Sequence, residues 1–147
     1  MEKQLISILV AEDDEDDRLL IKEAFEDIRI RNKIDFVNDG VELLEFLRRE
    51  GDFASEKENA LPGLILLDLN MPRMDGREAL AIIKKDPKLK LIPVIALTTS
   101  KAQEDILKTY ETGVSSFITK PVNYDDLSKI VKTLKSYWIE IVSLPIS

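Results

Sequence analysis

The chain has 147 residues, and its 21 lysines and arginines against 28 aspartates and glutamates leave a formal net charge of −7 at pH 7. This length suits a single domain with one hydrophobic core, and 44% hydrophobic with 33% charged residues is ordinary for a globular protein. The negative charge disfavours direct binding to nucleic acid or to an anionic membrane, because both repel it.

Cysteine and histidine are both absent from the sequence. Their absence excludes disulfides, thiol chemistry, Cys/His zinc sites and every mechanism that uses imidazole as the base. Any metal ion must therefore be bound by oxygen. The first residues show no signal-peptide pattern, and no apolar stretch approaches the roughly 18 residues of a membrane span. We therefore expect a cytoplasmic protein with no membrane association.

Strands and helices are predicted to alternate along the chain. Residues 6–11 form an apolar, β-branched run that ends at Glu12 and Asp13, the pattern of a strand buried on both faces. A helix is predicted over residues 16–30, where apolar residues recur at helical spacing. The same alternation predicts, in order, a strand at 34–36, a helix at 41–47, strands at 64–69 and 93–97 on either side of a helix at 77–85, a helix ending at Gly113, a strand at 116–119, and a last helix that Asn123 caps and that reaches Trp138.

Two segments fall outside this alternation. Residues 51–63 are polar and without periodicity, so they predict a long surface loop, which is either a site of partner contacts or a tolerated insertion. Residues 139–147 form a tail whose apolar side chains either fold back or form a dimer interface. We expect one domain over residues 1–147, with its core at about 6–138 and no output domain.

Strands that alternate with helices of this length indicate a doubly wound α/β fold, in which helices cover both faces of a parallel sheet. Ligands in such folds bind beyond the carboxyl ends of the strands. Glu12 and Asp13 follow the first predicted strand, Asp68 ends the third, Thr98 the fourth and Lys120 the fifth. The three carboxylates would repel one another if they converge, and a bound cation would reduce this repulsion. We expect Mg²⁺, because it is a hard cation that binds carboxylate, carbonyl and phosphate oxygens.

Four motifs mark these strand ends and carry a family resemblance. They are Leu9-Val-Ala-Glu12-Asp13, Leu67-Asp68-Leu-Asn70-Met-Pro72-Arg-Met-Asp75-Gly76, Ala96-Leu97-Thr98-Thr99 and Lys120-Pro121. In these motifs the chain resembles the response-regulator receiver domains of two-component signalling. In its loop at 51–63 and its tail at 137–145 it is similar to the single-domain regulators of phytochrome-like sensor kinases. The resemblance implies the flavodoxin-like strand order 2-1-3-4-5.

The resemblance also implies the roles of individual residues. It makes Asp68 the phosphoacceptor, and it assigns Mg²⁺ to Glu12, acting through water, to Asp13, to Asp68 and to the main-chain carbonyl of Asn70. Elementary chemistry agrees, because a carboxylate can attack a phosphoryl group only when the negative charges are neutralised, and Mg²⁺ with an ammonium does this.

Four further residues complete the implied site. Thr98 and Lys120 would hold phosphoryl oxygens, and Pro121 would follow a cis peptide bond that aims the lysine, as in the family. Where many receivers carry a tyrosine or phenylalanine that switches rotamer, this chain has Phe117, which lacks a hydrogen-bonding hydroxyl. We therefore expect switching to couple Thr98 to Phe117 by packing, without a tyrosine hydroxyl.

Several residues have a simpler interpretation. The acidic residues at 14–17 are expected to be the solvated start of a helix, favoured by the helix dipole, rather than further ligands. Thr98 alone could be an ordinary β-branched strand residue and Lys120 alone an ordinary surface lysine. Their places beside the other motifs favour function.

The predicted function is that of a stand-alone response regulator rather than an enzyme. It would accept a phosphoryl group from a sensor histidine kinase or a phosphotransfer protein, assist its own phosphorylation and dephosphorylation, and signal by changing its intermolecular contacts. One candidate contact is a homodimer through the face of the fourth helix, fifth strand and last helix, or through the tail. The alternatives are a phosphorylation-independent binding module and a Mg²⁺-dependent phosphohydrolase. Such a phosphohydrolase needs an Asp-x-Asp motif after the first strand, and the residues there match this motif poorly.

Overall fold

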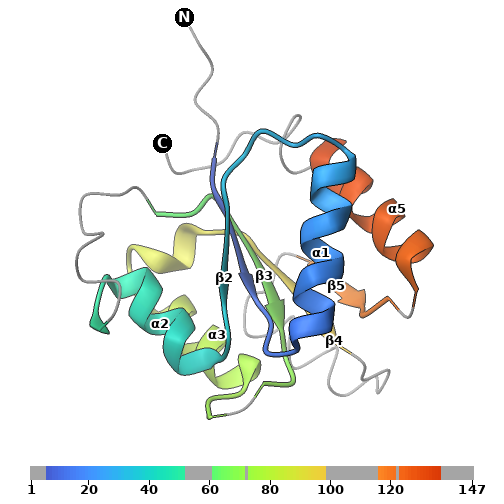
Figure 1. Cartoon of the computed structure of the whole chain (residues 1–147). Coiled ribbons are helices and arrows are strands. Elements are labelled where there is room, and N and C mark those ends of the chain that lie inside the picture. The colour runs from blue at the N-terminus through green and yellow to red at the C-terminus, as the bar shows by residue number, and fades with distance from the viewer. Residues whose placement is uncertain (1–5, 52–60, 72, 99–115, 122, 137–147) are drawn as a thin grey trace, which may run out of the picture.

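The computed structural model describes residues 6–51, 61–71, 73–98, 116–121 and 123–136, with the side chains of residues 98, 116 and 117 left out. The predicted helix ending at Gly113, residues 52–60 of the predicted loop and the tail at 139–147 lie outside this part (Figure 1). The elements are β1 (Ile8–Ala11), α1 (Glu15–Asp27), β2 (Ile34–Val37), α2 (Gly40–Arg48), β3 (Leu64–Asp68), α3 (Gly76–Lys85), the short 3₁₀ helix η2 (Leu89–Leu91), β4 (Val94–Thr98), β5 (Ser116–Thr119) and α5 (Tyr124–Leu134).

The five strands form one parallel sheet in the order β2-β1-β3-β4-β5, which confirms the expected doubly wound topology. β1 lies between β2 and β3, and Ile8 is paired with both Ile34 and Leu64. β1 and β3 are buried at every position, because this sheet has helices on both faces. All strands therefore present their carboxyl ends at one edge, the lower edge in Figure 1.

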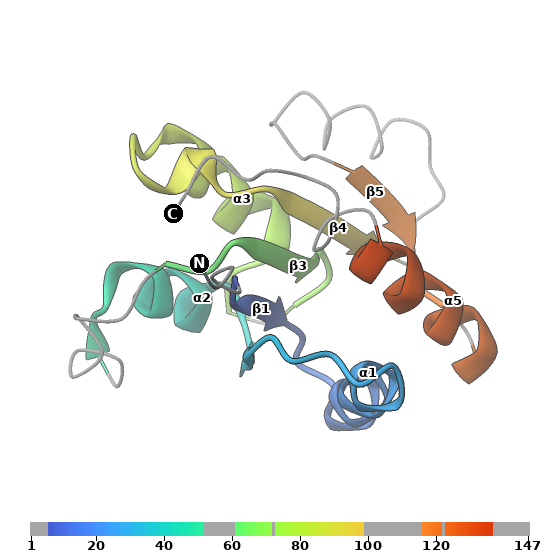
Figure 2. The same ribbon diagram turned by 90° about the horizontal axis from the view of Figure 1, so that it is seen from above.

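Alternate strand residues point into two separate cores. One core contains Leu9 and Ala11 from β1 together with buried residues of α2 and α3. The other contains Ile8 and Val10 together with Phe25 of α1 and buried residues of α5. Figure 2 shows α1 and α5 on one face of the sheet and α2 and α3 on the other.

A short polar side chain caps the N-terminus of each of the described α helices. Asp14, Asp39 and Asp75 each accept a backbone N–H from the first turn of α1, α2 and α3, respectively. Asn123 accepts the N–H of Asp126, which confirms its predicted role as the cap of the last helix.

The first helix is shorter than expected. Residues 16–30 were predicted to be helical, but α1 ends at Asp27. Arg29 takes a left-handed conformation with φ of 54°, and its N–H bonds to the carbonyl of Glu26, which closes the last turn. None of the helices within the described ranges has the length and apolar character needed to cross a membrane.

Candidate functional site

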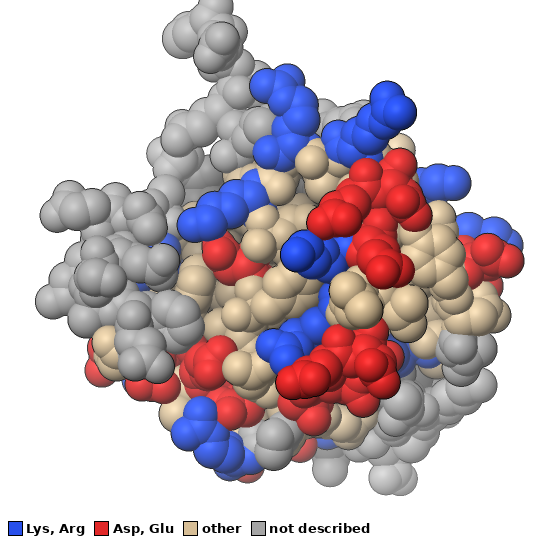
Figure 3. All heavy atoms as spheres, viewed as in Figure 1, with Lys and Arg blue, Asp and Glu red and all other residues tan. Residues whose placement is uncertain are grey.

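Three carboxylates meet at the carboxyl edge of the sheet. Glu12 and Asp13 directly follow β1, and Asp68 is the last residue of the neighbouring β3. One oxygen from each side chain lies within 4.8 Å of the others. Glu12 and Asp68 are buried, whereas Asp13 is exposed. Figure 3 shows an acidic surface in the region where the lower end of α1 lies in Figure 1. The site is thus a buried pair of carboxylates that opens to solvent at Asp13.

The crowding changes the protonation of Glu12. Burial, and then the neighbouring carboxylate of Asp68, raise the pKa of Glu12 to about 7, although the ammonium of Lys120 acts in the opposite direction. Near neutral pH the site therefore holds less negative charge than its sequence suggests. A cation that binds here replaces both the proton and part of the repulsion.

Lys120 supplies the positive charge of the site. The residue follows β5, and its Nζ lies 2.7 Å from Glu12 Oε1, 2.7 Å from Asp17 Oδ2 and 3.1 Å from Asp68 Oδ2. Burial by itself lowers the pKa of Lys120, but the three carboxylates outweigh burial and raise it. The ammonium stays charged and is placed beside the oxygen atoms of Asp68.

Main-chain groups orient the two buried carboxylates. The N–H of Asn70 donates to Asp68 Oδ1 at 2.9 Å, and the N–H of Asp14 donates to Glu12 Oε2 at 3.2 Å. The loop after β3 folds back so closely that a Cβ on Gly76 would lie 2.6 Å from the carbonyl oxygen of Asp68. Only glycine allows α3 to begin directly against the end of β3.

The donor set fits a hard divalent cation. The three carboxylates provide oxygen alone, the ligand type that Mg²⁺ and Mn²⁺ prefer. Burial of two of the three carboxylates gives such a cation a preformed site rather than a solvated acidic surface.

The structure places the remaining predicted residues as follows. The main chain of Thr98 ends β4 opposite Thr119, and that of Phe117 pairs with Ala96, but the side chains of Thr98 and Phe117 lie outside the described part. The predicted cis bond before Pro121 is wrong, because the peptide bonds of the described residues are all trans. Trans is the lower-energy form of such a bond, and Lys120 reaches Asp68 without the cis form.

Asp17 was not expected to belong to this site. Its position predicts the solvated start of a helix, but its carboxylate pairs with Lys120. The chain does contain a signal, since Asp17 lies in the first turn of α1, which begins two residues after Asp13 and therefore lies close to the same edge. The identity of its partner required the tertiary structure.

Comparisons with known proteins agree with this geometry. The sequence model of the response regulator receiver domain matches residues 8–132. Response regulator Rcp1 of Synechocystis is 41% identical over 138 residues, which cover 94% of this chain and 92% of Rcp1. The probable methanogenesis regulatory protein FilR2 of Methanothrix harundinacea is 38% identical over 133 residues, which cover 90% of this chain and 83% of FilR2.

Solved structures agree as well. The Mn²⁺-bound form of response regulator Rcp1 superposes with a TM-score of 0.86 at 41% identity, covering 95% of this chain and 99% of that one. The phosphorylated cyanobacterial phytochrome response regulator RcpA superposes with a TM-score of 0.88 at 42% identity, covering 97% of this chain and 99% of that one. The protein is therefore a member of the response-regulator receiver domain family.

Proposed function

We propose that the chain is a response regulator that accepts a phosphoryl group on Asp68 in a Mg²⁺-dependent reaction. The observation that carries this proposal is the convergence of Glu12, Asp13 and Asp68 with the ammonium of Lys120 at one edge of the sheet. A phosphoryl group adds negative charge to a place that already holds several carboxylates. The reaction therefore needs a metal cation together with the lysine.

The chemical step is a displacement at phosphorus. A carboxylate oxygen of Asp68 forms the new P–O bond while the bond between phosphorus and the donor breaks, and the donor leaves with the bonding electron pair. Lys120 Nζ, 3.1 Å from Asp68 Oδ2, is close enough to contact an oxygen of the incoming group. We assign Thr98 to another phosphoryl oxygen and Phe117 to the packing switch that follows phosphorylation.

The carboxylate cluster and the family resemblance together support the proposed metal ligands. Asp13 and Asp68 of this cluster would bind Mg²⁺ directly. By the family resemblance, the main-chain carbonyl of Asn70 would be a further ligand, and Glu12 would act through a water molecule. When bound, the cation neutralises the carboxylates and the transferred group, and so assists both phosphorylation and the later hydrolysis of the acyl phosphate. The Mn²⁺-bound structure of Rcp1 supports a divalent cation in this family.

The expected donor is a sensor histidine kinase or a phosphotransfer protein of the cytoplasm. Similarity to Rcp1 and to the phytochrome response regulator RcpA favours a phytochrome-like kinase. The output would be a change in intermolecular contacts. One candidate is a homodimer through the tail at 139–147, or through the face that includes β5 and α5.

Intact-mass analysis after incubation with acetyl phosphate and Mg²⁺ tests the proposal. We expect one labile phosphoryl adduct on the native protein and none on Asp68→Asn. Asp35→Asn is a matched control, because Asp35 is a partly exposed carboxylate in β2, at the far edge of the sheet from Lys120, and it should keep the adduct. A folded protein that binds Mg²⁺ but forms no adduct would instead be a phosphorylation-independent binding module, and continuous release of phosphate without an adduct would favour a phosphohydrolase.

A further inference from the structure

The ammonium of Lys120 has three ion-pair partners before any phosphoryl group arrives. An ammonium has three N–H donors, and three carboxylate oxygens lie within 3.1 Å of Nζ, on Glu12, Asp17 and Asp68. A phosphoryl oxygen that contacts Nζ therefore competes with these three carboxylates for the ammonium. Which partner is released decides how readily the lysine can serve the reaction.

A bound divalent cation would neutralise two of the three partners and so weaken their attraction to the lysine. Glu12 and Asp68 belong to the carboxylate cluster that the cation would neutralise, whereas Asp17 lies outside that cluster. Asp17 is also the most exposed of the three, with 37% of its side chain accessible compared with 1% for Glu12. Asp17 is thus the carboxylate that competes with the phosphoryl group for Lys120.

From this geometry we propose that Asp17 is a positioning residue that restrains Lys120 and slows phosphorylation of Asp68. The inference deepens the proposed function and depends on it. In the resting state Asp17 holds the ammonium toward the first turn of α1. In the phosphorylated state the lysine exchanges Asp17 for a phosphoryl oxygen, and the carboxylate of Asp17 returns to solvent.

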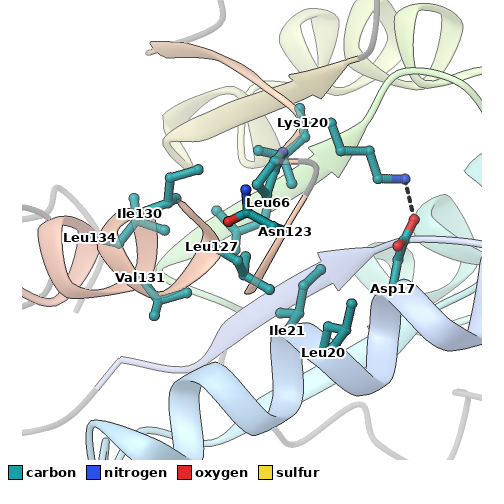
Figure 4. A pocket seen from close by; sticks show the side chains of 12 residues that line it. Asp17, Leu20, Ile21, Leu66, Lys120, Asn123, Leu127, Ile130, Val131 and Leu134 are labelled. Atoms are coloured by element: carbon teal, nitrogen blue, oxygen red, sulfur yellow. Dashed lines mark ion pairs between the residues drawn. The ribbon is translucent and has the colours of Figure 1, made fainter. Parts of the chain in front are cut away.

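The ion pair between Asp17 and Lys120 lies beside a largely apolar pocket. Figure 4 shows Asp17 and Lys120 at one end of a pocket between α1 and α5. Most of the lining is aliphatic, including Ile21, Leu127 and Val131. The ammonium cannot turn into this pocket without losing hydrogen bonds, so the pocket offers it no partner in place of the carboxylates.

The first turn of α1 contains a matched control. Asp16 precedes Asp17, has the same charge and the same favourable position at the helix N-terminus, and is exposed. Asp16→Asn therefore reproduces the change in net charge and in helix stability without changing the partners of Lys120. Asp17→Glu keeps the carboxylate and should keep the restraint.

The experiment measures two quantities on the full chain. They are the rate of adduct formation from acetyl phosphate with Mg²⁺ and the affinity for beryllofluoride with Mg²⁺, a mimic of the acyl phosphate. We expect Asp17→Asn to raise both by roughly two- to fivefold, the range for loss of a half-exposed ion pair, whereas Asp16→Asn and Asp17→Glu stay near the native values. In a Lys120→Gln background, Asp17→Asn should leave beryllofluoride affinity unchanged, because the restrained group is gone.

Three outcomes would overturn the inference. An Asp17→Asn protein that reacts no faster than the native one contradicts a restraint. Equal acceleration by Asp16→Asn shows a general charge effect. An effect of Asp17→Asn that persists without Lys120 shows that Asp17 acts elsewhere. In each of these cases the native protein still forms an adduct that Asp68→Asn lacks, whereas the absence of that adduct refutes the proposed function itself.

Discussion

Arg73 Nε lies 2.7 Å from Asp39 Oδ2, so an ion pair joins the loop after β3 to the start of α2. The other oxygen of Asp39 accepts the N–H of Glu42 at 2.8 Å. Beside this pair, the N–H of Gly40 donates to the carbonyl of Met74 at 3.0 Å. The loop that follows the proposed phosphoacceptor is therefore attached to α2 at two points, and it cannot move without disturbing that helix.

Replacement of Asp39 should cost stability. Asp39→Ala removes both a helix cap and the partner of Arg73, and we expect a loss of about 1–2 kcal/mol in the free energy of unfolding, measured with urea. Arg73→Gln should cost less, because the arginine side chain is 57% exposed. An Asp39→Ala protein as stable as the native one would show that the cap and the pair contribute nothing.

Asp39 also predicts an acid dependence. Burial raises the pKa of Asp39, but the Arg73 guanidinium and the N–H of Glu42 outweigh burial and hold it below its ordinary 3.8. A carboxyl whose pKa is lower in the folded state contributes stability above its unfolded pKa, and this contribution is lost as the pH falls through the folded value. The difference in stability between native protein and Asp39→Asn should therefore shrink below pH 3.8 in urea titrations.

Gly76 should be intolerant of a side chain. In Gly76→Ala the new Cβ would meet the carbonyl oxygen of Asp68 at 2.6 Å and the Cα of Leu69 at 2.7 Å, and both are main-chain atoms that cannot rotate away. We expect a loss of about 1–3 kcal/mol in unfolding free energy and slower phosphorylation, since the backbone of the acceptor must shift. If the Gly76→Ala protein were instead more stable than the native one, as expected for alanine at an unhindered helix position, the close approach would be refuted.

Binding of Mg²⁺ should depend on pH through Glu12. Because the pKa of Glu12 is raised to about 7, the cation must displace a proton in weakly acidic solution. Affinity measured by calorimetry should rise about tenfold between pH 6 and pH 8, as ionisation of Glu12 goes from roughly a tenth to nine tenths. Glu12→Gln should flatten this dependence, and an equally steep rise in that variant would assign the proton to another group.

The same raised pKa determines how the metal-free protein responds to pH. A carboxyl whose pKa is higher in the folded state contributes stability that is complete below the unfolded pKa, 4.5 for glutamate, and that is lost as the pH rises through about 7. In the presence of a chelator, the native protein should lose stability relative to Glu12→Gln as the pH rises from 4.5 to about 7. Added Mg²⁺ should restore stability at pH 8 more than at pH 6.

Two residues on α1 should differ sharply in their tolerance of alanine. Phe25 is completely buried between α1 and the sheet, whereas Leu19 is 55% exposed on the same helix. Phe25→Ala should lower the unfolding free energy by about 3–5 kcal/mol, because it leaves a large cavity. Leu19→Ala should stay within about 0.5 kcal/mol. Similar losses in the two variants would contradict the placement of the α1 face in the core.

Much of the fold was predictable because its signals are local. The apolar runs of β1 and β3 identify strands buried on both faces, and the carboxylates of Glu12 and Asp68 end those runs, so their convergence at one edge followed from parallel pairing. Asn123 was recognisable as a cap because a cap acts on the next residues in the chain. The strand order came from family resemblance, since periodicity does not state which strands are neighbours.

The sequence by itself determined which chemical groups are available: oxygen ligands only, carboxylates at the carboxyl ends of strands, and a lysine directly after the last strand. The tertiary structure decided the partners. It paired Lys120 with Asp17, tied Arg73 to Asp39 and left Pro121 in trans. It also raised the pKa of Glu12 by burying that side chain beside Asp68. Each of these depends on distances across space, which are set by strand order and helix packing, and no pattern of neighbouring residues encodes them.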